Sequence, residues 1–166
     1  MSIELKNIDN KNSYTERVWL SIFVIIGFIL IEGILIAVTV TTSIKVPATM
    51  TITIPICSGI GLLLLLIFIN YSSIRITINE SEINVKYGVF NKKTIQIDEL
   101  ISYGGTNASI RIYLGFGVRI GTDGSIAFTT RFGKAIRFES EDKRPLVVST
   151  NNPEKIITFI DQIKGK

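Results

Sequence analysis

The feature that most constrains this chain is a long apolar stretch near its N-terminus that contains almost no charge. Residues 18–70 include only two charged side chains, Glu32 and Lys45. The part from 18 to 41 is long enough to cross about 30 Å of hydrocarbon as a helix. A second apolar part, 50–70, follows after a short connection. We therefore expect an integral, multi-pass membrane protein with two spanning helices.

The distribution of Lys and Arg around these spans predicts their orientation. Lys6, Lys11 and Arg17 precede the first span, whereas Lys45 is the only basic residue between the two. The chain becomes basic again after the second span, beginning with Arg75. Lys and Arg accumulate on the cytoplasmic side of membrane proteins. We therefore expect a plasma-membrane protein with both termini in the cytoplasm.

Glu32 is a carboxylate inside the first predicted span, where an uncompensated charge is costly. In an antiparallel hairpin it lies at about the depth of residues 57–61 of the second span, where small side chains allow close helix packing. The hydroxyl of Ser58 in that stretch is a suitable hydrogen-bond donor. We expect Glu32 and Ser58 to form polar packing between helices, or Glu32 to bond to a second copy of the chain. A proton or ion site at Glu32 is the functional alternative.

From residue 73 onward the apolar pattern changes to a period of two, which is typical of strands with one buried face. Turn-forming residues separate the alternating segments. Residues 98–116 interrupt the pattern as a long connection, for which we expect a short helical turn at 98–102. The seven predicted strands are 73–79, 82–88, 94–98, 117–121, 125–130, 134–139 and 145–150.

The end of the chain predicts an amphipathic helix. Asn152 is a suitable N-cap residue, and Pro153 is favourable at the first helical position. An apolar stripe must pack against something, and the open end of a curled sheet is the expected partner. The side chains that share this stripe are Ile156, Phe159, Ile160 and Ile163.

This combination resembles the bacterial and archaeal membrane proteins that carry a pleckstrin-homology-like domain after a pair of transmembrane helices. The resemblance rests on the segments GFGVRIG, SIAFTTRFGKAIRFE and PLVVSTNNPEKIITFI. It implies a membrane α-hairpin followed by a mainly-β domain at 71–166, with residues 1–17 as a cytoplasmic segment. The domain would be a seven-stranded antiparallel β-barrel or sandwich capped by the C-terminal helix. The resemblance also implies binding to other proteins or self-association, and it brings no catalytic residues.

The composition argues against several kinds of chemistry. The chain has no histidine and a single cysteine, Cys57. It therefore lacks the usual general base and any set of cysteines for an intrachain disulfide or a zinc site. GFGVRIG leads into a predicted strand, whereas a dinucleotide fingerprint leads into a helix. We expect no enzyme activity, metal, cofactor or nucleic-acid partner.

Four basic residues on the predicted strands and turns are candidate contacts for anionic lipid headgroups or for a partner, because guanidinium and ammonium groups bind phosphate. They are Arg119, Arg131, Lys134 and Arg137. A solvated strand face is the alternative interpretation. The sequence thus predicts a membrane-anchored interaction or scaffold module, and the alternative is a membrane-tethered domain that senses a lipid or another ligand.

The predicted orientation can be checked by labelling single cysteines in intact cells. In a Cys57→Ser background, Ser2→Cys and Lys166→Cys should resist a membrane-impermeant thiol reagent, because both termini are expected in the cytoplasm. Lys45→Cys should react, because the connection between the spans is expected outside. Labelling of the termini without labelling at position 45 would show the opposite orientation, with both termini outside.

Overall fold

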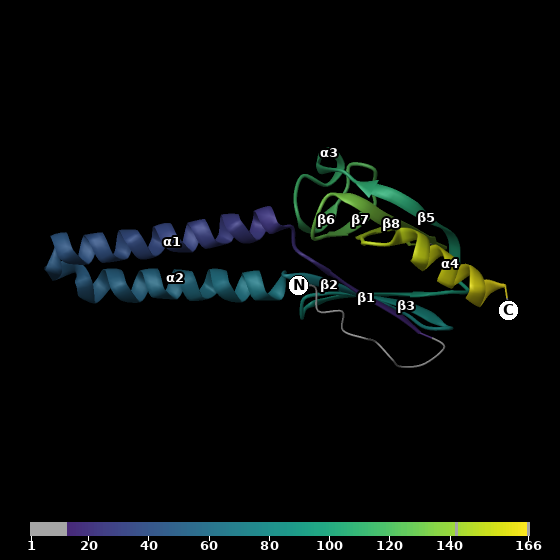
Figure 1. Cartoon of the computed structure of the whole chain (residues 1–166), viewed down its shortest axis with the longest axis horizontal. Coiled ribbons are helices and arrows are strands. Elements are labelled where there is room, and N and C mark those ends of the chain that lie inside the picture. Colours follow the sequence, from purple (N-terminus) through teal and green to yellow (C-terminus); the bar gives the residue numbers. More distant parts are fainter. Residues whose placement is uncertain (1–12, 142, 166) are drawn as a thin grey trace, which may run out of the picture.

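The computed structural model describes residues 13–141 and 143–165, and in it a long helical hairpin projects from a β domain (Figure 1). Helix α1 spans Ile22–Lys45, and α2 spans Met50–Asn70, with the short 3-10 helix η1 (Pro47–Thr49) between them. Both helices are long and apolar enough to cross a membrane, and their apolar windows are not buried inside the protein. The two-helix part of the sequence prediction is therefore confirmed.

The first predicted span begins too early. Val18 lies in a strand, β1 (Tyr14–Trp19), and α1 starts only at Ile22 and continues to Lys45. The side chain of Val18 is fully buried in the β domain. A short apolar strand directly before an apolar helix forms one continuous run in the sequence, so hydropathy alone could not separate the two elements. The second predicted span, in contrast, coincides with α2.

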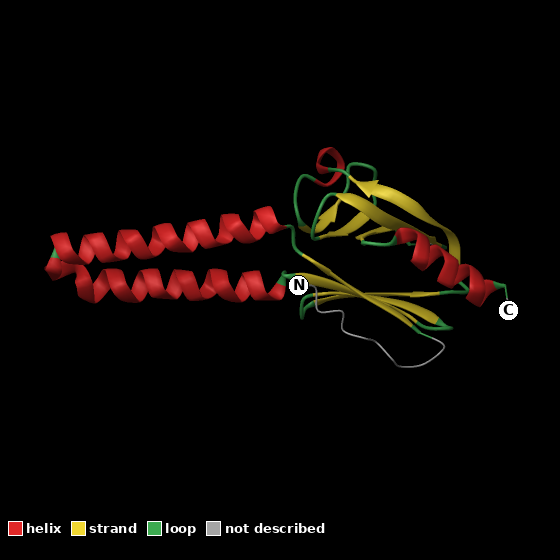
Figure 2. Cartoon of the chain, viewed as in Figure 1, coloured by secondary structure: helices red, strands yellow, loops and turns green. Residues whose placement is uncertain are grey.

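The β domain contains nine strands, within the described residues, arranged in two sheets (Figure 2). The first sheet has the order β1–β2–β3–β4 and is antiparallel throughout. Its further strands are β2 (Ser73–Ile78), β3 (Glu82–Tyr87) and β4 (Asn91–Gln96). The second sheet has the order β5–β8–β9–β7–β6. Its strands are β5 (Leu100–Ala108), β6 (Gly117–Ile120), β7 (Ile126–Thr129), β8 (Gly133–Ser140) and β9 (Leu146–Ser149).

Each of the seven predicted segments contains a strand, but the sequence prediction missed β1 and β5. The helical turn expected at 98–102 is wrong, because strand β5 begins at Leu100 and pairs with β8 along its length. The adjacent Gly104 and Gly105 and a register shift between Leu100 and Ser102 weaken the alternation of apolar residues. Only after this strand does the chain form a short helix, α3 (Ile110–Tyr113).

The prediction of a seven-stranded antiparallel barrel or sandwich is correct only in part, because the two sheets do not close into a barrel. The number of strands is larger, and β7 pairs with β9 in parallel, with Ile126 opposite Leu146. The parallel pair arises because β9 runs antiparallel to β8 and lies between β8 and β7, so it runs in the same direction as β7. The coarser prediction of a helical hairpin, a mainly-β domain and a final helix is confirmed.

The hydrophobic core lies between the two sheets and is completed by α4 (Pro153–Lys164). In α4 the side chains of Ile156 and Ile160 are fully buried, whereas Phe159 and Ile163 pack at the margin of the core. Pro153 occupies the first turn as predicted, but the side chain of Asn152 makes no capping hydrogen bond. The core residues from the sheets include Ile74, Ile76, Ile78, Ile83, Val85, Ile136, Phe138 and Val148.

A buried carboxylate ties β1 to the second sheet. Glu16 is only 8% exposed. It accepts hydrogen bonds from the Thr150 hydroxyl at 2.6 Å and from the Asn151 backbone N–H at 2.6 Å, just after β9. The phenol of Tyr14 also donates to it, at 3.0 Å. Burial, together with the neighbouring carboxylate, raises the pKa of Tyr14, so this phenol remains a donor. Strand β1 is therefore an integral part of the domain.

The antiparallel pairing of β1 with β2 predicts that the β domain can be made soluble by excising the hairpin. Leu20 donates its N–H to the Ser72 carbonyl at 2.9 Å, so the two chain ends already lie side by side. Replacing residues 21–71 by Asn-Gly, the preferred two-residue hairpin turn, should give a folded domain with a cooperative thermal transition. The fragment 72–165, which lacks β1, should lose its cooperative transition. Equal melting of both proteins, followed by circular dichroism, would contradict the role of β1.

Candidate functional site

The β domain is attached to the helical hairpin by two short, closely spaced chain connections. Only Leu20 and Ser21 separate β1 from α1. Ser21 donates its N–H to the Thr130 carbonyl at 3.0 Å, which joins the start of α1 to the second sheet. At the other connection Tyr71 packs edge-on against Tyr87, with 5.4 Å between ring centroids. These short, bonded connections hold one end of the domain at the boundary of the helical hairpin.

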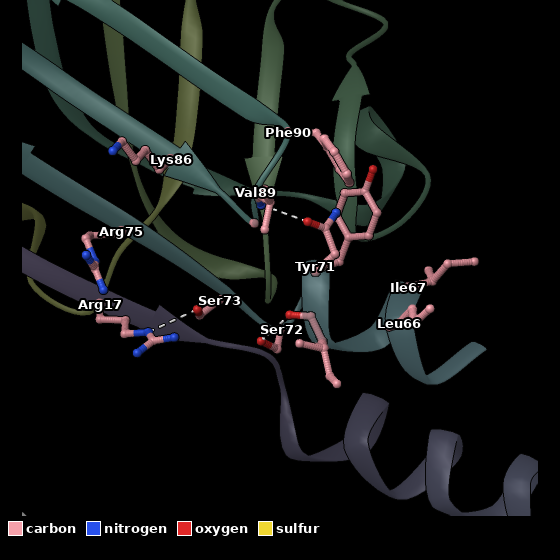
Figure 3. Close-up of a pocket in the computed structure, with 13 residues that line it drawn as sticks. Arg17, Leu66, Ile67, Tyr71, Ser72, Ser73, Arg75, Lys86, Val89 and Phe90 are labelled. Carbon is pink, nitrogen blue, oxygen red and sulfur yellow. Dashed lines mark hydrogen bonds between the residues drawn. The ribbon is translucent and has the colours of Figure 1, made fainter. Parts of the chain in front are cut away.

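The turn between β3 and β4 is docked on the last turn of α2. The Val89 N–H donates to Asn70 Oδ1 at 2.7 Å. Gly88 has a φ of +66°, and a Cβ at this position would lie 2.0 Å from the Asn70 carbonyl oxygen, so the close approach requires glycine. The tip of the turn presents Val89 and Phe90, which are 82% and 83% exposed. Two apolar side chains are thereby fixed beside the end of α2 (Figure 3).

A row of four basic side chains crosses the outer face of the first sheet near the same boundary. The register places Arg17 opposite Arg75, Arg75 opposite Lys86, and Lys86 opposite Lys92. All four side chains are exposed, and we call them the basic row. The next row on this face, farther from the helices, consists of uncharged residues: Thr15, Thr77, Asn84 and Thr94. Positive charge is thus concentrated at the end of the sheet that adjoins the hairpin.

A groove of about 820 Å³ lies between the basic row and the end of α2, and we call it the junction groove (Figure 3). Arg17, Arg75 and Lys86 line one side. The opposite side is apolar and consists of Leu66, Ile67 and Ile69 from α2 with Val89 and Phe90 from the turn. The hydroxyls of Ser72 and Ser73 also line it, and Ser73 Oγ accepts a hydrogen bond from Arg17 Nε at 3.0 Å.

A second crevice, of about 680 Å³, lies between the other side of the hairpin and the edge of the second sheet. Phe28 and Phe68, stacked at 4.1 Å, belong to its helical wall, and Phe116 and Val118 to its sheet wall. Among the residues that the structure describes, Arg119 is the only charged one in its lining. The crevice is therefore mainly an apolar contact region between the helices and β6.

The structure does not bring the four predicted basic residues together as one surface. Arg137 forms salt bridges with Asp123 at 3.0 Å and with Glu139 at 2.7 Å. Hydrogen bonds from Ser125, with a further contribution from Arg137, lower the pKa of Asp123, so this carboxylate stays charged as a partner. The charge of Arg137 is therefore neutralised locally.

The other three predicted residues lie in separate places. Arg131 donates to the Thr150 carbonyl at 3.1 Å and also contacts the Asn151 side chain, so it supports the loop after β9. Lys134 is exposed, but strand alternation places it on the opposite face of β8 from Arg137. Arg119 is exposed on β6, where its Nε donates to the Phe116 carbonyl at 3.3 Å.

Within the hairpin, Glu32 lies next to Gly61 and is not bonded to Ser58. A Cβ at Gly61 would be 3.2 Å from Glu32 Oε2, and Glu32 Oε1 is buried without a hydrogen-bond partner. Ser58 is exposed on the outer surface of α2. The antiparallel arrangement agrees with the prediction, but the residue that faces Glu32 is Gly61, three positions further along α2, whereas the side chain of Ser58 is exposed. The small-residue contact is retained, with Gly61 in place of Ser58.

The residues at the junction offer positive charge, hydroxyls and apolar surface, a combination suited to an amphipathic anion. Among residues 13–141 and 143–165, no group of three or more His, Cys, Asp or Glu side chains is placed to hold a metal ion. No protein-family model, curated protein or solved structure matches this chain. The site is therefore defined by its own geometry.

Part of the basic row could have been predicted from the sequence by considering how neighbouring strands pair as well as their alternating pattern. Arg75 and Lys86 lie on the polar faces of two predicted strands, and the turn between those strands sets them opposite each other. Arg17 was assigned to the segment before the membrane, because β1 was not recognised as a strand. Because Arg17 lies on β1, the complete basic row could not be predicted without that strand.

The docking of the β3–β4 turn predicts different consequences for two glycines that both have positive φ. Gly124→Ala, at φ +78° in open space, should cost only the left-handed backbone strain of about 1–2 kcal/mol. Gly88→Ala should cost clearly more, because the new Cβ also collides with the Asn70 carbonyl. The measurement is thermal unfolding of the full-length variants in detergent. Equal losses for the two variants would show that the turn is not held against α2.

Proposed function

We propose that this chain is a membrane-anchored interaction module whose β domain is a binding platform fixed at the membrane surface. The observation that carries the proposal is the double attachment of the domain to the hairpin. Only two residues lie between β1 and α1, and only two lie between α2 and β2. A domain held in this way presents the same end to the membrane at all times. On the orientation predicted by Lys and Arg, this is the cytoplasmic surface of the plasma membrane.

The exposed groups at the junction support binding as the role of this platform. Phe90 and Val89 are large apolar side chains exposed beside arginine and lysine residues. Aromatic residues and Arg are enriched in protein interfaces. A scaffold that binds another membrane protein, or a second copy of this chain, would use such a surface. We therefore place the interaction at the membrane-proximal end of the domain and propose no enzymatic activity.

A membrane-tethered lipid or ligand sensor is the second candidate function, and the junction groove is the observation that favours it. The groove combines three cations with an apolar wall, as an anionic amphiphile requires. This candidate uses the same surface as the scaffold function, so the two differ only in what is bound.

We also retain, as part of the proposal, a distant relationship to pleckstrin-homology-like membrane proteins. Two facing sheets and a C-terminal helix that buries Ile156 and Ile160 between them support this relationship. The parallel pair β7–β9 and the strand contributed from before the first span are departures from the expected antiparallel domain.

The proposal is tested by photo-crosslinking in native membranes. A photoreactive amino acid replacing Phe90 should give defined adducts, because this side chain is exposed at the membrane-proximal tip. The same amino acid replacing Arg144, in the loop between β8 and β9, should give far fewer. Protein adducts at position 90 would support the scaffold function, and lipid adducts would support the sensor. Adducts that form only at position 144 would place the binding surface elsewhere and contradict the proposal.

A further inference from the structure

The basic row is an unfavourable arrangement for the β domain by itself. Side chains directly opposite on neighbouring strands interact, and like charges in such positions are destabilising. The row contains three successive like-charge pairs across four strands. The salt bridges formed among residues 13–141 and 143–165 all involve Arg137 or Lys143, so none neutralises this row. An anion bound at the row would remove the repulsion.

The position of the row matches the headgroup layer of a bilayer. Helix α2 has 21 residues, or about 32 Å at 1.5 Å per residue, which is the thickness of the hydrocarbon core. Arg75 lies five residues after the end of α2 at Asn70, and it lines the same groove as Ile69 in the last turn of α2. The headgroup region on each side of the core is about 5–8 Å thick. The groove therefore joins the cations to the helix end, where lipid headgroups would lie.

The junction groove has a polar wall and an apolar wall, as a phospholipid has a polar headgroup and apolar acyl chains. The cations and the hydroxyls of Ser72 and Ser73 are on the sheet side, where they face the headgroup level. Leu66 and Ile69 continue the groove down the side of α2, into the level of the acyl chains. Phe90 and Val89 extend the apolar wall from the docked turn (Figure 3). Both parts of one lipid can therefore be contacted at once.

We propose that the junction groove binds one anionic phospholipid, with its phosphate between Arg17, Arg75 and Lys86 and an acyl chain along α2 and Phe90. The inference rests on the proposed function, because the groove meets lipid only if the domain is held at the membrane surface. It goes further by naming the ligand class and the residues that bind it. The bound lipid also neutralises part of the charge of the basic row.

The test uses the full-length chain in lipid nanodiscs that contain phosphatidylcholine with or without phosphatidylglycerol. Native mass spectrometry of the released protein should show one retained phosphatidylglycerol per chain. Arg75→Gln/Lys86→Gln should reduce its retention by about thirtyfold, on a scale of about fivefold for each surface cation. Lys143→Gln/Arg144→Gln removes the same two charges from the loop after β8 and should leave retention unchanged.

Thermal unfolding in the same nanodiscs gives an independent readout. In phosphatidylcholine alone, Arg75→Gln/Lys86→Gln should be at least as stable as the natural chain, because like-charge repulsion is relieved. Phosphatidylglycerol should raise the unfolding temperature of the natural chain and of the control variant, but not of Arg75→Gln/Lys86→Gln. If phosphatidylglycerol stabilises all three proteins equally, or if soluble glycerol phosphate stabilises the natural chain as well as the lipid does, the inference is wrong.

A third measurement separates this inference from the proposed function. A fluorophore on Phe90→Cys, in a Cys57→Ser background, should be quenched by nitroxides attached to lipid headgroups. Quenching without selective lipid retention would overturn the lipid site and leave the membrane-surface module intact. Absence of quenching would overturn both.

Discussion

The interaction on which the rest of the structure depends is the buried contact between Glu16 and the end of the second sheet. Its carboxylate accepts hydrogen bonds from Thr150 and Asn151, residues that follow it by more than 130 positions in the chain. A buried carboxylate that lost these donors would be strongly unfavourable. Glu16 therefore ties β1, an edge strand of the first sheet, to the second sheet, and β1 leads into α1 after two residues. Together with the hydrogen bond from Ser21 to Thr130, this contact links the start of the helical hairpin to the packing of the β domain.

The sequence was sufficient to predict those elements whose pattern is repeated locally. A period of two identified β2, β3, part of β4 and the four strands β6 to β9, and a helical stripe identified α4. It failed where one element merges into another or lacks a clear pattern. Val18 joins the apolar run of α1 although it belongs to a strand, and Gly104 and Gly105 interrupt the alternation of β5. Parallel pairing of β7 with β9 was beyond prediction, because strand order depends on contacts between distant segments.

The candidate site was less predictable than the fold for a related reason. Exposed cations were easily found, but which of them share a surface depends on strand register. Arg137 was selected from the sequence, yet Asp123 approaches it from a separate turn and neutralises it. Arg17 and Lys86 are 69 positions apart, and only the pairing of β1 and β3 with β2 aligns them. Glu32 shows the same limit within the helical hairpin, where the packing of α1 on α2 places Gly61 beside it.

The pairing of β1 with β2 has a consequence for how the protein is made. Strand β1 leaves the ribosome before either span, whereas β2 follows both of them. If α1 and α2 each cross a bilayer, as we propose, the two strands can meet only after both helices have returned the chain to its original side. On that proposal, a molecule with one span uninserted would leave β1 and β2 on opposite sides of the membrane. On the proposed topology, completion of the first sheet therefore depends on the insertion of both helices.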